Sequence, residues 1–220
     1  MTDCADPSHL LDSISLTHVQ FDPNDKVAYA FGYITLAPIA ILVFYASVIV
    51  SRREMAGIFM LIGQLLNEAF NYVLKEAIEQ ERPHSHLGDG YGMPSSHSQF
   101  IWFFAVYGSL HLYKRIQLDH VYWKHLVCLA MYALAVLVSL SRIYLGYHTL
   151  NQVLAGSSVG VLFGCVWYGI TCYCYASGLV DFILELNISK KLYLRDMSHL
   201  DNVAKWEYEQ WQKQRVNKRE

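Results

Sequence analysis

The chain has 220 residues, a length typical of one domain, and 54% of them are hydrophobic, which is above the average of soluble globular proteins. Charged residues make up only 16%, and the formal net charge of −2 gives no basic field of the kind that binds nucleic acid. The five cysteines form neither a disulfide framework nor a zinc-ligand spacing. Composition therefore favours a membrane protein over a soluble nucleic-acid-binding or disulfide-rich domain.

Apolar runs long enough to cross a bilayer predict an all-α fold, a polytopic transmembrane helical bundle of about five spans. In chain order the expected spans are 27–50, 55–75, 98–113, 126–147 and 149–176. A short stretch at 179–186 is expected to lie at the membrane surface. These boundaries define three regions, namely an extracytoplasmic N-terminal arm (1–26), a membrane domain (27–188) and a cytoplasmic tail (189–220).

The distribution of lysine and arginine predicts the orientation. Thirteen of the 17 basic residues fall at 52–53, at 114–124 or after residue 188, which five spans place on one side. Because basic residues concentrate on the cytoplasmic side, the tail is expected in the cytosol and the N-terminus on the other side. Three short motifs at the remaining span ends then fall together on the extracytoplasmic or lumenal side.

The second span carries a polar stripe. Gln64, Glu68, Asn71 and Lys75 are spaced by four, three and four residues, which places them on one helical face. Two interpretations are open at this stage. The stripe either bonds neighbouring helices together, or it leads to a polar pocket with Lys75 at the mouth and Glu68 and Asn71 in support.

The three motifs supply the groups that phosphoryl transfer needs. Lys75 is followed after six residues by Arg82-Pro83, Pro94-Ser95-Ser96-His97 opens the third span, and Ser141-Arg142 precedes His148 by six residues. Serines at a helix start cap backbone N–H groups, and the same helix end attracts anions.

The cations and histidines point to one chemistry. Lys75, Arg82 and Arg142 can stabilise a transferring phosphoryl group without a metal, and His97 and His148 suit acid–base or nucleophilic work. The alternative, a metal or haem held by the two histidines, is disfavoured because three nearby cations oppose a bound metal cation. No cofactor is therefore expected. The motifs abut long apolar runs, so the phosphate is expected on a lipid.

In order and spacing, the motifs over residues 75–152 resemble the lipid phosphatase family called PAP2, or acid phosphatase/haloperoxidase-like. The resemblance implies a helical bundle, a phosphohistidine intermediate and no metal. It implies that His148 is the nucleophile and His97 the general acid. The phosphate-binding residues that it implies are Lys75, Arg82, Ser95, Ser96 and Arg142.

Two positions depart from the family pattern. Ser96 stands where the family has Gly, and Gln152 stands where the family has Asp, four residues after His148. That Asp orients the nucleophilic imidazole and favours its positive charge. The amide of Gln152 can accept the Nδ1–H of the imidazole but carries no charge.

Within the family, the stretches 91–100 and 141–148, together with Gln152, are most similar to the branch that hydrolyses dolichyl diphosphate. The similarity implies an endoplasmic reticulum membrane enzyme that removes the terminal phosphate of this polyprenyl lipid on the lumenal side, recycling the lipid carrier of N-glycosylation. Two alternatives stay open: a phosphatase for lipid monoesters such as phosphatidate, and a protein that binds or scrambles lipid phosphates without turnover.

Overall fold

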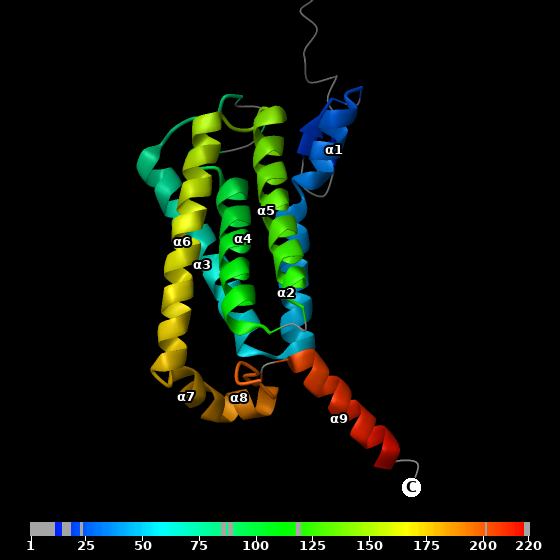
Figure 1. Cartoon of the computed structure of the whole chain (residues 1–220). Helices are drawn as coiled ribbons and strands as arrows, with labels where there is room; N and C mark the ends of the chain where they lie inside the picture. The colour runs from blue at the N-terminus through cyan, green and yellow to red at the C-terminus, as the bar shows by residue number, and fades with distance from the viewer. Residues whose placement is uncertain are drawn as a thin grey trace, which may run out of the picture.

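The structure is a computed structural model of the chain, and it describes residues 12–14, 19–22, 24–84, 87, 90–117, 120–200 and 202–217. These residues form a bundle of long helices, with a small hairpin at one end and short helices at the other (Figure 1). Most of the predicted N-terminal arm at 1–26, and the last three residues of the predicted tail, lie outside the described residues.

The elements follow one another in simple up-and-down order. A two-stranded antiparallel hairpin comes first, formed by β1 (Asp12–Ile14) and β2 (Val19–Phe21). The helices of the bundle are α1 (Lys26–Ile34), which is short, and the longer α2 (Ala37–Arg52), α3 (Met55–Ile78), α4 (Ser96–Arg115), α5 (Val121–Tyr144) and α6 (Leu150–Ala176). Three more helices follow, namely α7 (Leu179–Glu185), α8 (Asn187–Leu192) and α9 (Val203–Asn217).

The prediction of an all-α membrane bundle is confirmed. Four segments of the described chain are long and apolar enough to cross a membrane, namely Lys26–Arg52, α3, α5 and α6. The third predicted span, 98–113, lies within α4, which is less apolar and packs against α3, α5 and α6 with Ile101 and Phe103 fully buried. About five spans is thus consistent with four apolar helices around a central one.

The first predicted span is not one continuous helix. Thr35 and Leu36 form a turn after Ile34, with backbone angles still in the right-handed helical region, and α2 begins at Ala37 with Pro38 in its first turn. Proline has no N–H with which to donate to the carbonyl four residues earlier, so it favours a new helix start over continuation of the old one. α1 therefore leans away from α2 and packs on α5 (Figure 1).

Glycines on α6 allow α4 to approach closely. A Cβ atom added at Gly156 would lie 2.5 Å from the carbonyl oxygen of Ser95, and one at Gly160 would lie 2.4 Å from that of Gln99. Both distances are far below van der Waals contact, so only glycine fits. Small residues spaced by four are a common way for membrane helices to bring their backbones together.

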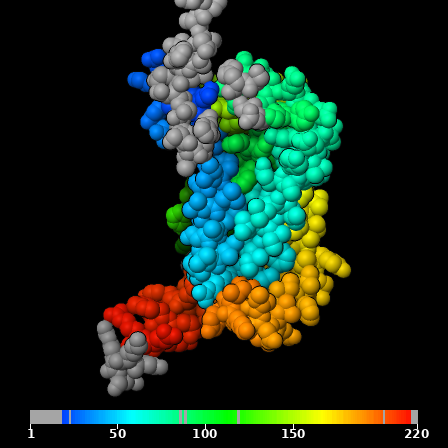
Figure 2. Space-filling model, turned by 180° about the vertical axis from the view of Figure 1, so that it is seen from behind, coloured from blue at the N-terminus to red at the C-terminus, as the bar shows by residue number. Residues whose placement is uncertain are grey.

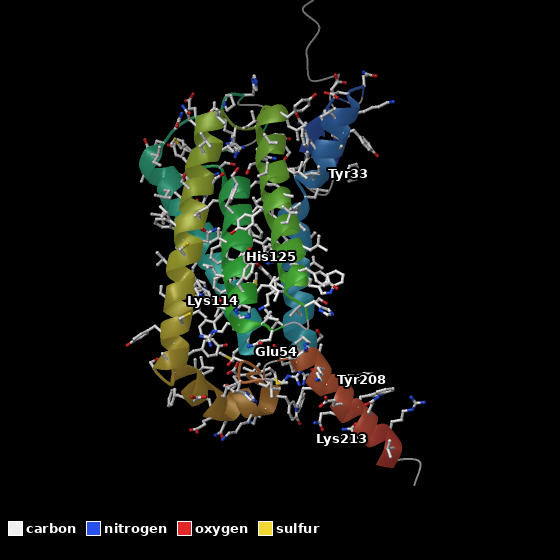
Figure 3. The ribbon with its side chains drawn as sticks, in the orientation of Figure 1. Tyr33, Glu54, Lys114, His125, Tyr208 and Lys213 are labelled. Atoms are coloured by element: carbon white, nitrogen blue, oxygen red, sulfur yellow. The ribbon has the colours of Figure 1, made fainter. Side chains whose placement is uncertain are left out.

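The alternating chain direction separates two ends of the bundle. The last turns of α3 and α5 and the first turns of α4 and α6 lie at one end, and α7 to α9 lie at the other (Figure 1). α2 and α3 lie side by side on the face seen in Figure 2. Figure 3 shows Tyr33 at the first end and Glu54 at the second, where α9 leaves the bundle. All three motifs therefore lie at the end opposite α9.

Ion pairs hold the tail to the second end of the bundle. Arg52 Nη1 donates to Glu207 Oε2 at 2.7 Å, and Arg195 Nη2 lies 3.4 Å from Glu207 Oε1. Both arginine side chains are about 40% exposed, so each pair adds little stability in isolation.

We expect Gly160→Ala to destabilise the protein, because its methyl group would overlap the Gln99 carbonyl and force α4 away from α6. Overpacking of this kind costs about 1–3 kcal/mol. Thermal unfolding of the purified protein in detergent measures the effect. Gly169→Ala is the matched control on the same helix, because no atom lies within 4 Å of its added Cβ. Equal melting temperatures for the two variants would contradict the close approach.

Candidate active site

The three motifs converge on one cavity of about 390 Å³. Polar groups line one part of it, namely Glu68, Gln64, Arg82, Ser96, His97, Arg142 and His148. Apolar side chains line the rest, namely Pro38, Ile39 and Leu42 of α2, Leu65 of α3 and Phe100 of α4. The cavity therefore joins a cationic, histidine-bearing end to an apolar wall between α2 and α3.

Gln152 fixes the orientation of the His148 ring. The start of α6 is a capping box, in which Thr149 Oγ1 accepts from the Gln152 backbone and Gln152 Oε1 accepts from the Thr149 backbone at 3.2 Å. The amide Nε2 of Gln152 donates to the carbonyl of Glu81 at 2.9 Å. Gln152 Oε1 therefore faces His148 Nδ1 at 3.2 Å as an acceptor. The proton must then sit on Nδ1, which leaves the Nε2 lone pair available.

An aspartate at position 152 would not reproduce these contacts. A carboxylate has no N–H, so it could not donate to the Glu81 carbonyl that Gln152 holds. Glu81 directly precedes Arg82, so Gln152 links the nucleophile candidate to the chain segment that carries one of the cations. This gives the departure from the family pattern a structural role.

His148 sits in a buried, positively charged environment. Its side chain is 3% exposed, and its backbone N–H donates to the carbonyl of Arg142 at 3.1 Å. Burial lowers the pKa of His148 to about 3, and the guanidinium groups of Arg142 and Arg82 add to that effect. The ring is therefore neutral at neutral pH, which is the state that a nucleophile needs.

The serine turn lies directly against the start of α6. The backbone N–H of Ser95 donates to the Gln152 carbonyl at 3.1 Å, and Ser98 Oγ donates to Ser95 Oγ at 3.2 Å. Ser95 is fully buried, whereas Ser96, the first residue of α4, lines the cavity. First-turn N–H groups have no partner within their own helix, so this helix start can bind an anion.

The two remaining cations come from the end of α3 and the segment after it. Arg82 Nε donates to the Gly90 carbonyl at 3.2 Å, and the Gly92 N–H donates to the Gln80 carbonyl at 2.6 Å. These bonds join the two described ends of the connection between α3 and α4. Lys75 lies in the last turn of α3, where its ammonium interacts electrostatically with Arg82, Glu68 and Arg142.

Residues of the polar stripe on α3 have both of the roles that the sequence left open. Gln64 and Asn71 are buried, and Asn71 Nδ2 donates to Gln99 Oε1 at 2.7 Å and lies 3.5 Å from the Pro94 carbonyl. These two residues bond α3 to α4. Glu68 lines the cavity, and so does Gln64, whose Nε2 also donates to the Phe100 carbonyl at 3.4 Å. The stripe thus contains both helix–helix hydrogen bonds and a pocket residue.

Sequence reasoning missed Gln99 as a member of the site's support. Its Nε2 donates to the Asn67 backbone carbonyl at 2.9 Å and to Asn67 Oδ1 at 3.0 Å, all within the buried α3–α4 contact. The available signal was a polar residue in the first helical turn after the Ser-Ser-His motif. Six of the ten predicted site residues line the cavity, and Asn71, Ser95 and Gln152 are buried. The tenth, Lys75, is not part of the lining but interacts electrostatically with Arg82, Glu68 and Arg142.

Comparison with known proteins gives a consistent result. The PAP2 superfamily model matches residues 56–175. The chain is 38% identical over 205 residues to human "Dolichyldiphosphatase 1", covering 89% of this chain and 86% of that protein. It is 37% identical over 219 residues to "Dolichyldiphosphatase" of Saccharomyces cerevisiae, covering 92% and 88%.

A solved structure is also similar. It is the crystal structure of a transmembrane PAP2-type phosphatidylglycerolphosphate phosphatase from Bacillus subtilis, which matches with a TM-score of 0.55 and 27% identity. The match covers 66% of this chain and 76% of that one.

At pH 7 we expect the His148 ring to be neutral with its proton on Nδ1. Nitrogen-15 spectra of histidine-labelled protein, assigned with a His148→Ala variant, should show one protonated and one bare ring nitrogen, still neutral at about pH 5. Since the folded-state pKa lies below the unfolded value, His148 favours folding above about pH 6.5, and this contribution falls as the pH drops. Exposed His120 is the comparison within the same protein. An imidazolium at position 148 at pH 7 would contradict the neutral state expected from burial.

Proposed function

This chain is a phosphatase of the PAP2 superfamily, and on that premise we propose that it hydrolyses dolichyl diphosphate to dolichyl phosphate and inorganic phosphate. The observation that carries the proposal is a neutral, oriented His148 among arginines, at the polar end of a cavity whose other walls are apolar. The relatives named as dolichyldiphosphatases support this choice of substrate.

The cavity suits a lipid with an anionic head. Arg82, Arg142 and Lys75 would hold the terminal phosphate, and the first-turn N–H groups at Ser96 would add hydrogen bonds. Leu42 of α2 and Leu65 of α3 line the same cavity and are also exposed on the bundle surface. The isoprenoid chain would therefore leave the site between α2 and α3 and enter the bilayer.

In the first step, the Nε2 lone pair of His148 attacks the terminal phosphorus. The bond from that phosphorus to the bridging oxygen breaks, and His97 gives its proton to the oxygen as dolichyl phosphate departs. Gln152 accepts the Nδ1–H of the phosphorylated ring. The three cations stabilise the charge on the equatorial oxygens during transfer.

In the second step, water hydrolyses the phosphohistidine. His97, now without its proton, takes a proton from the water as the water oxygen bonds to phosphorus and the phosphorus–nitrogen bond breaks. His148 returns to its neutral form and inorganic phosphate leaves. His97 lines the same cavity as His148, so one histidine can act as acid and then as base.

We further propose that the site faces the lumen of the endoplasmic reticulum. The division into a lumenal arm at 1–26, a membrane domain at 27–188 and a cytoplasmic tail at 189–220 belongs to the same proposal. Its support is the placement of the motifs at the end of the bundle opposite α9, together with the basic loops on the α9 side. In that location the product would return to use as the lipid carrier of N-glycosylation.

We expect purified protein to release phosphate from a polyprenyl diphosphate at an unchanged rate in EDTA. The His148→Ala variant should lose at least about 10³-fold in kcat, because no other group supplies the nucleophile. His120→Ala changes an exposed histidine outside the cavity and should keep full activity, which makes it the matched control.

Other outcomes of the same assay separate the alternatives. Turnover of phosphatidate but not of the diphosphate would replace the proposed substrate with a lipid monoester. Turnover of neither lipid, with binding retained, would favour a protein that binds or scrambles lipid phosphates. Loss of activity in EDTA would contradict the metal-free mechanism.

A further inference from the structure

Arg142 is a buried cation without a carboxylate partner among the described residues. Its side chain is 4% exposed. The ion pairs found in the described chain involve Arg52, Arg195, Glu54 and Glu207, at the far end of the bundle. An unpaired charge in a membrane protein interior is costly, so its surroundings must satisfy it in another way.

A hydroxyl group between α1 and α2 accepts a hydrogen bond from the guanidinium group of Arg142. Arg142 Nη1 donates to Thr35 Oγ1 at 2.8 Å, and Thr35 is 1% exposed. Thr35 is the C-cap of α1, in the break that Pro38 enforces before α2. The turn between α1 and α2 thus brings a hydroxyl acceptor to the guanidinium.

An aromatic ring also packs against the guanidinium group of Arg142. The guanidinium carbon of Arg142 lies 3.9 Å from the centroid of the Tyr147 ring, a cation–π contact. The hydroxyl of Tyr147 accepts from the backbone N–H of Gln20, so the strand β2 holds this ring in place. Arg142 Nε is buried and has no hydrogen-bond partner among the described residues, which leaves it available to an anion.

We propose that Thr35 is a positioning residue that aims Arg142 at the phosphoryl group. A hydroxyl fixes the guanidinium without neutralising it, whereas a carboxylate at this place would compete with the phosphate for the same N–H groups. Thr35 and Tyr147 fix the plane of the fork, and the remaining N–H groups serve the substrate. The inference rests on the proposed function only for the identity of the anion.

The test compares three threonine variants. Thr35→Val keeps the shape and removes the acceptor, Thr35→Ser keeps the hydroxyl, and Thr171→Val makes the same change at a buried threonine of α6 that bonds the Trp167 carbonyl. Three quantities are measured for each. KM and kcat are measured for a polyprenyl diphosphate, and the dissociation constant of orthovanadate, a tetrahedral oxyanion, is measured from its effect on the melting temperature.

We expect Thr35→Val to weaken orthovanadate binding and to raise KM by about tenfold, the usual effect of losing a hydrogen bond to a charged group. Thr35→Ser should stay within about twofold of the unchanged protein, and Thr171→Val should bind orthovanadate normally. A loss in Thr35→Val no larger than that in Thr171→Val would overturn the inference. So would an equal loss in Thr35→Ser, because the methyl group rather than the hydroxyl would then matter.

The orthovanadate measurement separates this inference from the proposed function, because it needs no turnover. Weakened binding in Thr35→Val without hydrolysis of the diphosphate by the unchanged protein would contradict the proposed substrate and support the role of Thr35. An unchanged protein that binds no orthovanadate would overturn the role of Thr35, since Arg142 would have no oxyanion to hold.

Discussion

The backbone of α4 touches the backbone of α6 through Gly156 and Gly160, and the active site depends on that contact. The contact sets Ser95 against the start of α6, where its N–H reaches the carbonyl of Gln152. Gln152 in turn holds the ring of His148 and the carbonyl before Arg82. One helix crossing therefore aligns the serine turn, the proposed nucleophile and a cation, which are distant in sequence.

The site concentrates positive charge and places no carboxylate beside Arg142 among the described residues. Hydrogen bonds from neutral groups orient the machinery instead: the amide of Gln152 orients His148, and the hydroxyl of Thr35 holds Arg142. Such an arrangement is costly in the empty protein, because buried charge remains unpaired. Under the proposed function, a phosphate dianion entering the site would offset this cost, so the unpaired charge would favour binding of the substrate.

The sequence predicted the long helices and marked the residues of the candidate site, because both signals are local: apolar runs indicate spans, and cations, serines and histidines at span ends indicate a candidate phosphate site. It did not predict the break at Thr35 or the contact of that residue with Arg142, 107 positions away. Pro38 was the local signal for a break in the helix. The partner of the Thr35 hydroxyl, however, depends on the packing of α1 against α5. Likewise, the sequence alone could not show that Asn71 bonds to α4 whereas Glu68 lines the cavity, because both roles depend on how α4 packs against α3.

The central claim is that the phosphoryl group passes through the ring of His148. The most direct measurement is a rapid alkaline quench of the protein turning over a polyprenyl diphosphate that carries phosphorus-32 in its terminal group, followed by peptide mapping. We expect a label that survives base, is lost in acid as a phosphorus–nitrogen bond is, and maps to the peptide containing His148. Phosphate release from active protein with no trapped label on that peptide, or with the label on another residue, would contradict the phosphohistidine route.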